Sequence, residues 1–105
     1  MDFQLMTKRA VEIRKQYEAK EKQLYGSAWT NDEITLGFVG DVGDLAKLIV
    51  AQNGKRNIPD SKDKLAHELA DCLWSLLVIS KLHDIDLEQS FAKTMDELEE
   101  HLSNP

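Results

Sequence analysis

The 105-residue sequence is poor in cysteine, proline and glycine, and each scarcity excludes a class of structure. A single cysteine, Cys72, cannot form an internal disulfide, which favours a reducing environment. Five glycines and two prolines are few for a β-sandwich, whose many turns use both residues. No apolar run approaches the roughly 20 residues that cross a membrane. The first residues, MDFQLMTKR, lack the charged-then-apolar order of a signal peptide. We therefore expect a cytoplasmic protein without membrane association.

A basic stripe is also absent, and acidic residues outnumber basic ones, so that the net charge is −6. Binding to the phosphate backbone of DNA or RNA is therefore not expected. A small phosphorylated ligand is compatible with this charge, since a bound divalent cation lets an acidic site hold a polyanion. The length and the 42% hydrophobic content are typical of one globular domain, which we assign to residues 1–105.

Apolar periodicity predicts four helices and no strand, so the expected fold class is an all-α, four-helix bundle. The predicted helices cover about residues 2–24, 30–52, 62–83 and 87–102. Side chains that favour helix N-termini precede the last three helices. These capping signals are Thr30 with Glu33, then Asp60 or Ser61, and then Asp86 with Gln89.

The two central helices are apolar nearly all the way round. The second carries Leu36, Val39 and Val50 opposite its main apolar stripe, and the third adds Leu73 and Trp74 to its own. A helix that is apolar on every side is buried on every side. Because two neighbours with polar faces cannot bury both helices, we expect a homodimer that packs the central helices together.

Four carboxylates interrupt the apolar sides of these helices. Asp41 and Asp44 lie in GDVGDLAKLI, and Glu68 and Asp71 lie in HELADCLWSLL. Each pair has i, i+3 spacing and projects from one side of its helix, one turn apart. On a helical wheel all four fall beside apolar residues. Anions that point inward repel one another or become protonated unless something positive lies among them.

Three kinds of positive partner could lie among the four carboxylates. Neither central helix contains an arginine, and Lys47 and Lys81 lie toward other faces. The Glu-x-x-His pairs of di-iron bundles are absent, and His67-Glu68-x-x-Asp71 lacks the second histidine of a zinc-protease helix. An all-oxygen set suits Mg²⁺ or Mn²⁺, and Mg²⁺ usually bridges a few carboxylates to substrate phosphates. The residues therefore favour a metal site and nucleotide chemistry, with a purely structural role for the acids as the alternative.

The same stretches, continued by DIDLEQSFAKTMDEL, resemble the MazG-like all-α nucleoside triphosphate pyrophosphohydrolases. The family motif Glu-x-x-Glu, spacer, Glu-x-x-Asp is matched here by Asp41-x-x-Asp44, the 23 residues 45–67, and Glu68-x-x-Asp71. The resemblance covers about residues 29–98. It implies hydrolysis of a nucleoside triphosphate, such as a dNTP, to monophosphate and pyrophosphate. It also assigns all four acids as Mg²⁺ ligands and catalytic residues, in a bundle that assembles as a homodimer or tetramer.

The sequence departs from the family pattern at several positions. Both acids of the first pair are Asp instead of Glu, and Gly40 stands where some members carry an additional Glu. Thr94 occupies the position of a lysine that usually holds phosphate. We expect Lys93 to supply that contact instead, or Lys55 or Arg56 from the loop between the central helices.

Four other residues are candidates either for the site or for a structural role. Trp29 either stacks on a nucleobase or acts as a hydrophobic staple at the start of its helix. Trp74 is expected in the core or a dimer interface, Cys72 in the core, and His67 on an exposed face.

The leading hypothesis is thus an Mg²⁺-dependent nucleotide pyrophosphohydrolase that removes unwanted or excess deoxynucleotides. The main alternative is a non-catalytic helical oligomerisation or regulatory module that keeps the fold. A third hypothesis is a metal-dependent enzyme acting on another phosphate ester.

Overall fold

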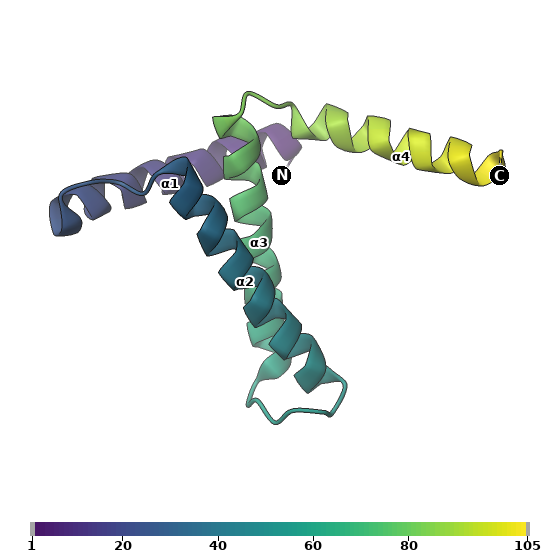
Figure 1. Ribbon diagram of the computed structural model, residues 1–105, viewed down its shortest axis with the longest axis horizontal. Helices are drawn as coiled ribbons and strands as arrows, with labels where there is room; N and C mark the ends of the chain where they lie inside the picture. The colour runs from purple at the N-terminus through teal and green to yellow at the C-terminus, as the bar shows by residue number, and fades with distance from the viewer. Residues whose placement is uncertain (1, 105) are drawn as a thin grey trace.

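The computed structural model describes residues 2–104, which form four α-helices (Figure 1). Helix α1 spans Phe3–Tyr25, α2 Asn31–Gln52, α3 Ser61–Leu82 and α4 Leu87–Ser103. No strand occurs within residues 2–104. The predicted all-α, four-helix fold is confirmed, and each predicted helix end lies within one residue of the observed one.

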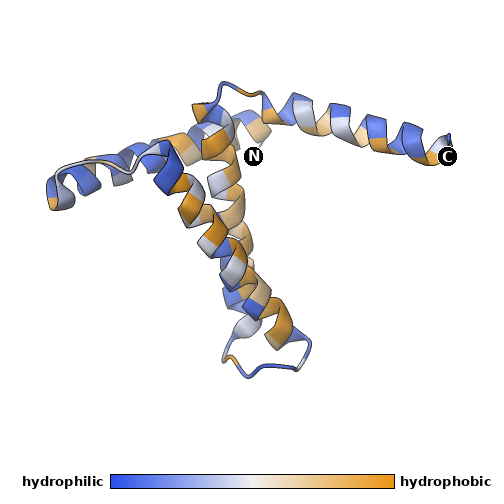
Figure 2. Cartoon of the chain, in the orientation of Figure 1, coloured by the Kyte–Doolittle hydropathy of each residue, from blue (hydrophilic) through white to orange (hydrophobic). Residues whose placement is uncertain are grey.

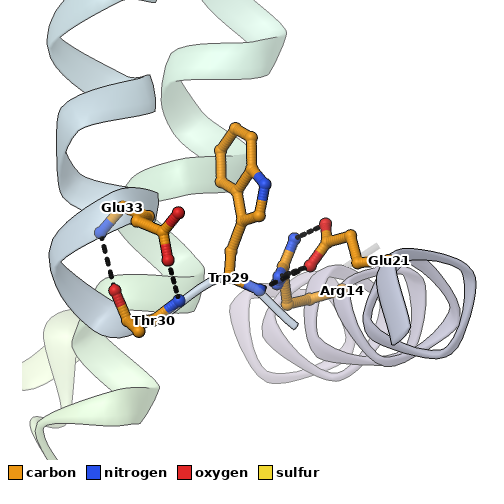
Figure 3. A network of polar contacts seen from close by, with 5 residues as sticks. All are labelled: Arg14, Glu21, Trp29, Thr30 and Glu33. Atoms are coloured by element: carbon orange, nitrogen blue, oxygen red, sulfur yellow. Dashed lines mark hydrogen bonds and ion pairs between the residues drawn. The ribbon is translucent and has the colours of Figure 1, made fainter. Parts of the chain in front are cut away.

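The helix starts follow the predicted capping signals with one exception. Thr30 Oγ1 accepts from the Glu33 amide at 3.2 Å, and the Glu33 carboxylate accepts from the Thr30 amide at 3.0 Å, which completes a capping box (Figure 3). Asp86 accepts from the Gln89 amide at 3.1 Å. Asp60 stands at the N-cap of α3, but its φ of 54° is left-handed and its side chain makes no capping bond. A capping side chain needs an extended backbone at this position.

Helices α2 and α3 run antiparallel, side by side, and α1 crosses α3 near the end of this pair (Figure 1). The buried core lies at the crossing and consists of Ala10, Ile34, Leu77 and Val78. Trp74 packs against this core and donates from its indole Nε1 to the Ala10 carbonyl oxygen at 3.0 Å. One aromatic side chain thus fixes α1 on α3, next to the turn of α3 that carries Asp71.

Large apolar residues of the central helices remain exposed in the single chain. Figure 2 shows apolar residues along much of α2 and α3, in agreement with their predicted all-round apolar character. Helix α4 leads away from the other three helices and buries none of its residues (Figure 1). It nevertheless carries apolar residues at three- and four-residue steps along one side. The large exposed apolar residues of these three helices include Leu36, Val39, Ile49, Leu69, Leu76, Phe91, Met95, Leu98 and Leu102. Within the described residues of one chain, two apolar surfaces therefore stay exposed. One lies on α2 and α3, and the other lies on α4.

Within residues 2–104, no helix is both long enough and apolar enough to cross a bilayer.

Candidate metal centre and adjoining cavity

Three of the four predicted acids come together between α2 and α3. Asp41 and Asp44 from α2 and Glu68 from α3 each offer a carboxylate oxygen, and these three oxygens lie within 4.8 Å of one another. Asp41 and Glu68 are half-buried, whereas Asp44 is exposed. The i, i+3 spacing aims the α2 pair at α3, and the antiparallel packing of the two helices supplies the third oxygen.

The surroundings of Asp41 and Glu68 disfavour the charged form of both carboxylates. Burial raises the pKa of Asp41, and the negative charges of Asp71 and Asp44 raise it further. Burial likewise raises the pKa of Glu68, with added repulsion from Asp41, Asp71 and Asp44. The neighbouring negative charges therefore disfavour ionisation of Asp41 and Glu68. A cation placed among the three oxygens would reverse this effect.

The cluster fits a hard cation on one further observation. Glu68 Oε2 is buried and accepts no hydrogen bond from any described residue. No lysine or arginine within residues 2–104 forms an ion pair with Asp41, Asp44 or Glu68. A buried carboxylate oxygen without a donor is costly unless a ligand completes it. Three carboxylates without nitrogen or sulfur ligands match the preference of Mg²⁺ or Mn²⁺.

The fourth predicted acid, Asp71, is not a member of the three-oxygen group. Its Oδ2 lies 3.2 Å from Nε2 of His67, one turn earlier on α3. His67 was expected on an exposed face, and its side chain is indeed 74% exposed, yet it also borders the site. Asp71 thus stands beside the cluster, where its role as a metal ligand stays a prediction.

A cavity of about 470 Å³ adjoins the acids. Asp41 and Asp71 line one side of it, and aromatic and aliphatic side chains line much of the remainder. A larger hollow of about 590 Å³ lies where α1, the end of α3 and the start of α4 meet, but none of the predicted site residues lines it. The smaller cavity includes Trp29, Trp74, Tyr17, Ile34 and Val78 in its wall. It therefore combines carboxylates with an apolar space large enough for a planar ring.

Trp29 forms one wall of this cavity and remains 44% exposed. Its ring rests on the backbone of α2 at Gly37, where an added Cβ would come within 3.0 Å of the indole. Gly37 therefore allows a close approach that a larger residue would obstruct. This position is compatible with both predicted roles of Trp29, which are stacking on a nucleobase and acting as a hydrophobic staple at the start of α2.

Alanine at Gly37 tests this close approach against the matched change Gly40→Ala. Nothing lies within 4 Å of a Cβ at Gly40, so Gly40→Ala is expected to gain up to about 1 kcal/mol of stability from helix propensity alone. Gly37→Ala should gain less, because the indole of Trp29 must shift, and should change the fluorescence of Trp29. Urea denaturation and emission spectra measure both effects. Equal gains and unchanged spectra would show that the indole does not depend on Gly37.

The predicted phosphate contacts, Arg56 included, lie away from this cavity. Lys93 is on α4, 4.0 Å from Glu97, and Lys55 is in the connection between α2 and α3. Neither belongs to the lining of the cavity. Their roles therefore stay predictions. Cys72 is buried, as expected of a core residue, and burial raises the pKa of its thiol.

Sequence reasoning missed the contribution of α1. Arg14, Tyr17 and Glu21 all line the cavity, and Arg14 and Glu21 are among the most buried residues in the described chain. Their spacing places them on one side of α1, two turns apart for the charged pair. Helix α1 carries many charged residues, however, and spacing alone does not distinguish a buried pair from an exposed one.

The fold and site define a helical protein with a carboxylate cluster for a hard cation beside an aromatic cavity. Comparison with known families identifies the class more closely, because the MazG nucleotide pyrophosphohydrolase domain matches residues 30–102. The chain belongs to this family, which indicates nucleotide pyrophosphohydrolase activity in general and a nucleotide as substrate. No curated protein and no solved structure gives a significant match.

Proposed function

We propose that the protein hydrolyses nucleoside triphosphates, and deoxynucleotides in particular, between the α and β phosphates. Water is consumed, and a nucleoside monophosphate and pyrophosphate are released. We further propose that this reaction removes unwanted or excess deoxynucleotides in the cytoplasm. The family match supports the reaction type, and the cavity beside the acids supports a nucleotide as the ligand.

The observation that carries the proposal is the buried, unpaired Oε2 of Glu68 within the carboxylate cluster. Asp41, Asp44 and Glu68 would hold Mg²⁺, with Asp71 as the fourth proposed ligand. When bound, this ion neutralises charge on the phosphates and helps to orient the attacking water. Trp29 and the apolar wall of the cavity would receive the nucleobase, because aromatic rings stack on any base.

Product analysis tests this proposal directly. The protein is incubated with a panel of canonical and modified NTPs and dNTPs, with Mg²⁺, with Mn²⁺ and with EDTA. Monophosphate and pyrophosphate that disappear with EDTA are the expected products. Orthophosphate release would instead indicate a different phosphate ester reaction. No turnover with either metal would favour the non-catalytic module, for which the exposed apolar surfaces are the relevant feature.

The raised pKa values of Asp41 and Glu68 predict how the stability of the metal-free protein depends on pH. Their ordinary values are 3.8 and 4.5, and both are higher in the folded chain. Between the ordinary and raised values the folded state binds more protons than the unfolded state. These two groups therefore lower the free energy of unfolding as pH rises through that window.

Chemical denaturation in EDTA at a series of pH values measures this contribution. The double variant Asp41→Asn/Glu68→Gln cannot titrate at these positions, so its stability should increase relative to wild type as pH rises from about 4 toward neutrality. A constant difference between the two proteins would show that neither carboxyl has a raised pKa.

We also propose that two chains associate through the exposed apolar faces of α2 and α3, as a dimer or within a tetramer. No large side chain in the described residues is fully buried, which is unusual for a chain of this length. A stable dimer typically buries about 1,200–2,000 Å² in total. A second chain would cover Leu36, Val39 and their neighbours.

Val39→Glu tests this association, because Val39 is 61% exposed and lies on the proposed interface. A buried, unpaired charge opposes association, so the variant should sediment as a monomer in analytical ultracentrifugation when wild type sediments as a dimer or tetramer. Gln16→Glu, on the exposed side of α1, adds the same charge outside the interface and should leave the oligomer intact. A monomeric wild type would contradict the proposal.

A further inference from the structure

A buried ion pair on α1 supports the wall of the cavity (Figure 3). Arg14 Nη1 donates to Glu21 Oε2 at 2.9 Å, and Nη2 donates to Oε1 at 2.6 Å. Arg14 is 9% exposed and Glu21 is 8% exposed. Such two-pronged contacts between guanidinium and carboxylate fix both distance and orientation. Both residues precede the segment 30–102 that the MazG family shares.

The pair reaches beyond α1 through the backbone of Trp29. Glu21 Oε1 accepts a third hydrogen bond, from the Trp29 amide at 2.8 Å (Figure 3). The Arg14 hydrogen bonds hold the pKa of Glu21 below its ordinary value, so the acceptor stays charged at neutral pH. The connection between α1 and α2 is therefore tied to α1 at the residue whose side chain forms the cavity wall.

The indole of Trp29 is also fixed. On one side the ring rests on Gly37 of α2. The guanidinium carbon of Arg14 lies 5.9 Å from the ring centroid, within the range of a cation–π contact. The ring is nevertheless 44% exposed, and it shares the cavity lining with Asp41 and Asp71. Its backbone and its ring are thus restrained while part of the ring remains accessible to a ligand.

Holding α1 next to α2 does not by itself require a buried ion pair such as Arg14–Glu21. Arg14 Nε is buried and donates to no described acceptor, which carries a desolvation cost. Apolar side chains of similar volume often replace a buried ion pair without loss of stability. What an apolar pair cannot provide is the acceptor for the Trp29 amide. What distinguishes this ion pair from an apolar pair is therefore that it fixes the backbone and the ring of Trp29.

We propose that Arg14 and Glu21 are positioning residues that set nucleotide affinity by holding Trp29 against the cavity that receives the nucleobase. This inference rests on the proposed function of that cavity. Both residues line the cavity, but the proposed effect acts through Trp29 and requires no contact between the pair and the substrate. The pair then affects how tightly the nucleobase binds. It does not affect hydrolysis at the carboxylate cluster. Loss of the pair should raise KM and leave kcat nearly constant.

The decisive variant is Arg14→Met/Glu21→Leu, which removes the acceptor and leaves no buried charge unpaired. KM for each dNTP that wild type hydrolyses is expected to rise by up to about tenfold, with kcat within about twofold. Arg9→Met/Glu12→Leu makes the same chemical change at exposed positions of the same helix and should leave both constants unchanged. Circular dichroism and thermal melts confirm that each variant is folded.

A binding measurement complements the kinetics. Trp74 is left in place because it fixes α1 on α3, and comparison with Trp29→Phe identifies the part of the tryptophan fluorescence that comes from Trp29. The four α,β-imido deoxynucleoside triphosphates with Mg²⁺ serve as probes, since the bond proposed to break is blocked. Quenching should saturate at concentrations up to about tenfold higher when the Arg14–Glu21 pair is removed. The free variant should also show altered emission, because its indole is no longer held.

Trp29→Ala separates failure of this inference from failure of the proposed function. Loss of base stacking should raise KM roughly 5- to 150-fold. If it does so while Arg14→Met/Glu21→Leu binds like wild type, the pair does not position Trp29. If Trp29→Ala leaves KM unchanged, the base does not stack there and the inference is overturned, although hydrolysis stands. A fall in kcat for the double variant would also overturn it. Without any turnover, the proposed function fails, and the quenching titration still decides the role of the pair.

Discussion

Replacing Glu68 with glutamine is expected to change activity and stability in opposite directions. Hydrolysis should fall by at least about a hundredfold, because substituting a group that only supports a metal ligand already costs about 10- to 100-fold. In EDTA the variant should melt at a higher temperature than wild type. The charged form of Glu68 is disfavoured by burial and by repulsion from Asp41, which a neutral amide avoids. Pyrophosphate release and thermal melts measure the two effects.

The control for this experiment is Glu99→Gln, which makes the same change at an exposed position on α4. It should alter neither property. Lower stability of Glu68→Gln in EDTA would contradict the account of the cluster, because it would mean that the carboxylate supports the fold without a cation. Full activity would remove Glu68 from the metal site.

Removal of Arg14 alone is expected to cause the largest loss of stability. Arg14→Ala leaves the carboxylate of Glu21 buried without its partner, which typically costs about 3–5 kcal/mol. Arg14→Met/Glu21→Leu should lose only about 1 kcal/mol, because the Trp29 amide loses its acceptor but no charge is left unpaired. Urea denaturation monitored by circular dichroism measures both.

Arg9→Ala provides the matched control, because Arg9 is exposed on the same helix. Its effect should remain within about 0.5 kcal/mol. An Arg14→Ala variant as stable as this control would show that water screens the ion pair. If Arg14→Met/Glu21→Leu were as unstable as Arg14→Ala, the loss of stability would come from altered side-chain packing and not from an unpaired buried charge.

The fold was predictable from the sequence to the extent that it is local. Apolar periodicity determines the helices, and Thr30 with Glu33 marks the start of α2 because the capping box involves only neighbouring residues. The convergence of Asp41, Asp44 and Glu68 was also predictable. Three-residue spacing fixes the side of each helix, and a short connection makes α2 and α3 antiparallel neighbours.

Interactions between distant segments were not predictable in the same way. Whether the Arg14–Glu21 pair is buried or exposed depends on where α1 crosses α3, and no local pattern specifies that crossing. The His67–Asp71 contact could have been expected from its i, i+4 spacing. Its position at the cavity could not, because the cavity exists only once α1 is in place.

Helix α4 has a consequence for the proposed assembly. An isolated helix of 17 residues has marginal stability in water, and α4 packs against the core of its own chain through Leu87, which is only partly buried. Its stability must then come from whatever covers Phe91 and the apolar residues that follow. If a second chain does so, part of the free energy of association is spent on ordering α4. The complex is then weaker than its buried area suggests, and dissociation is accompanied by a loss of helix.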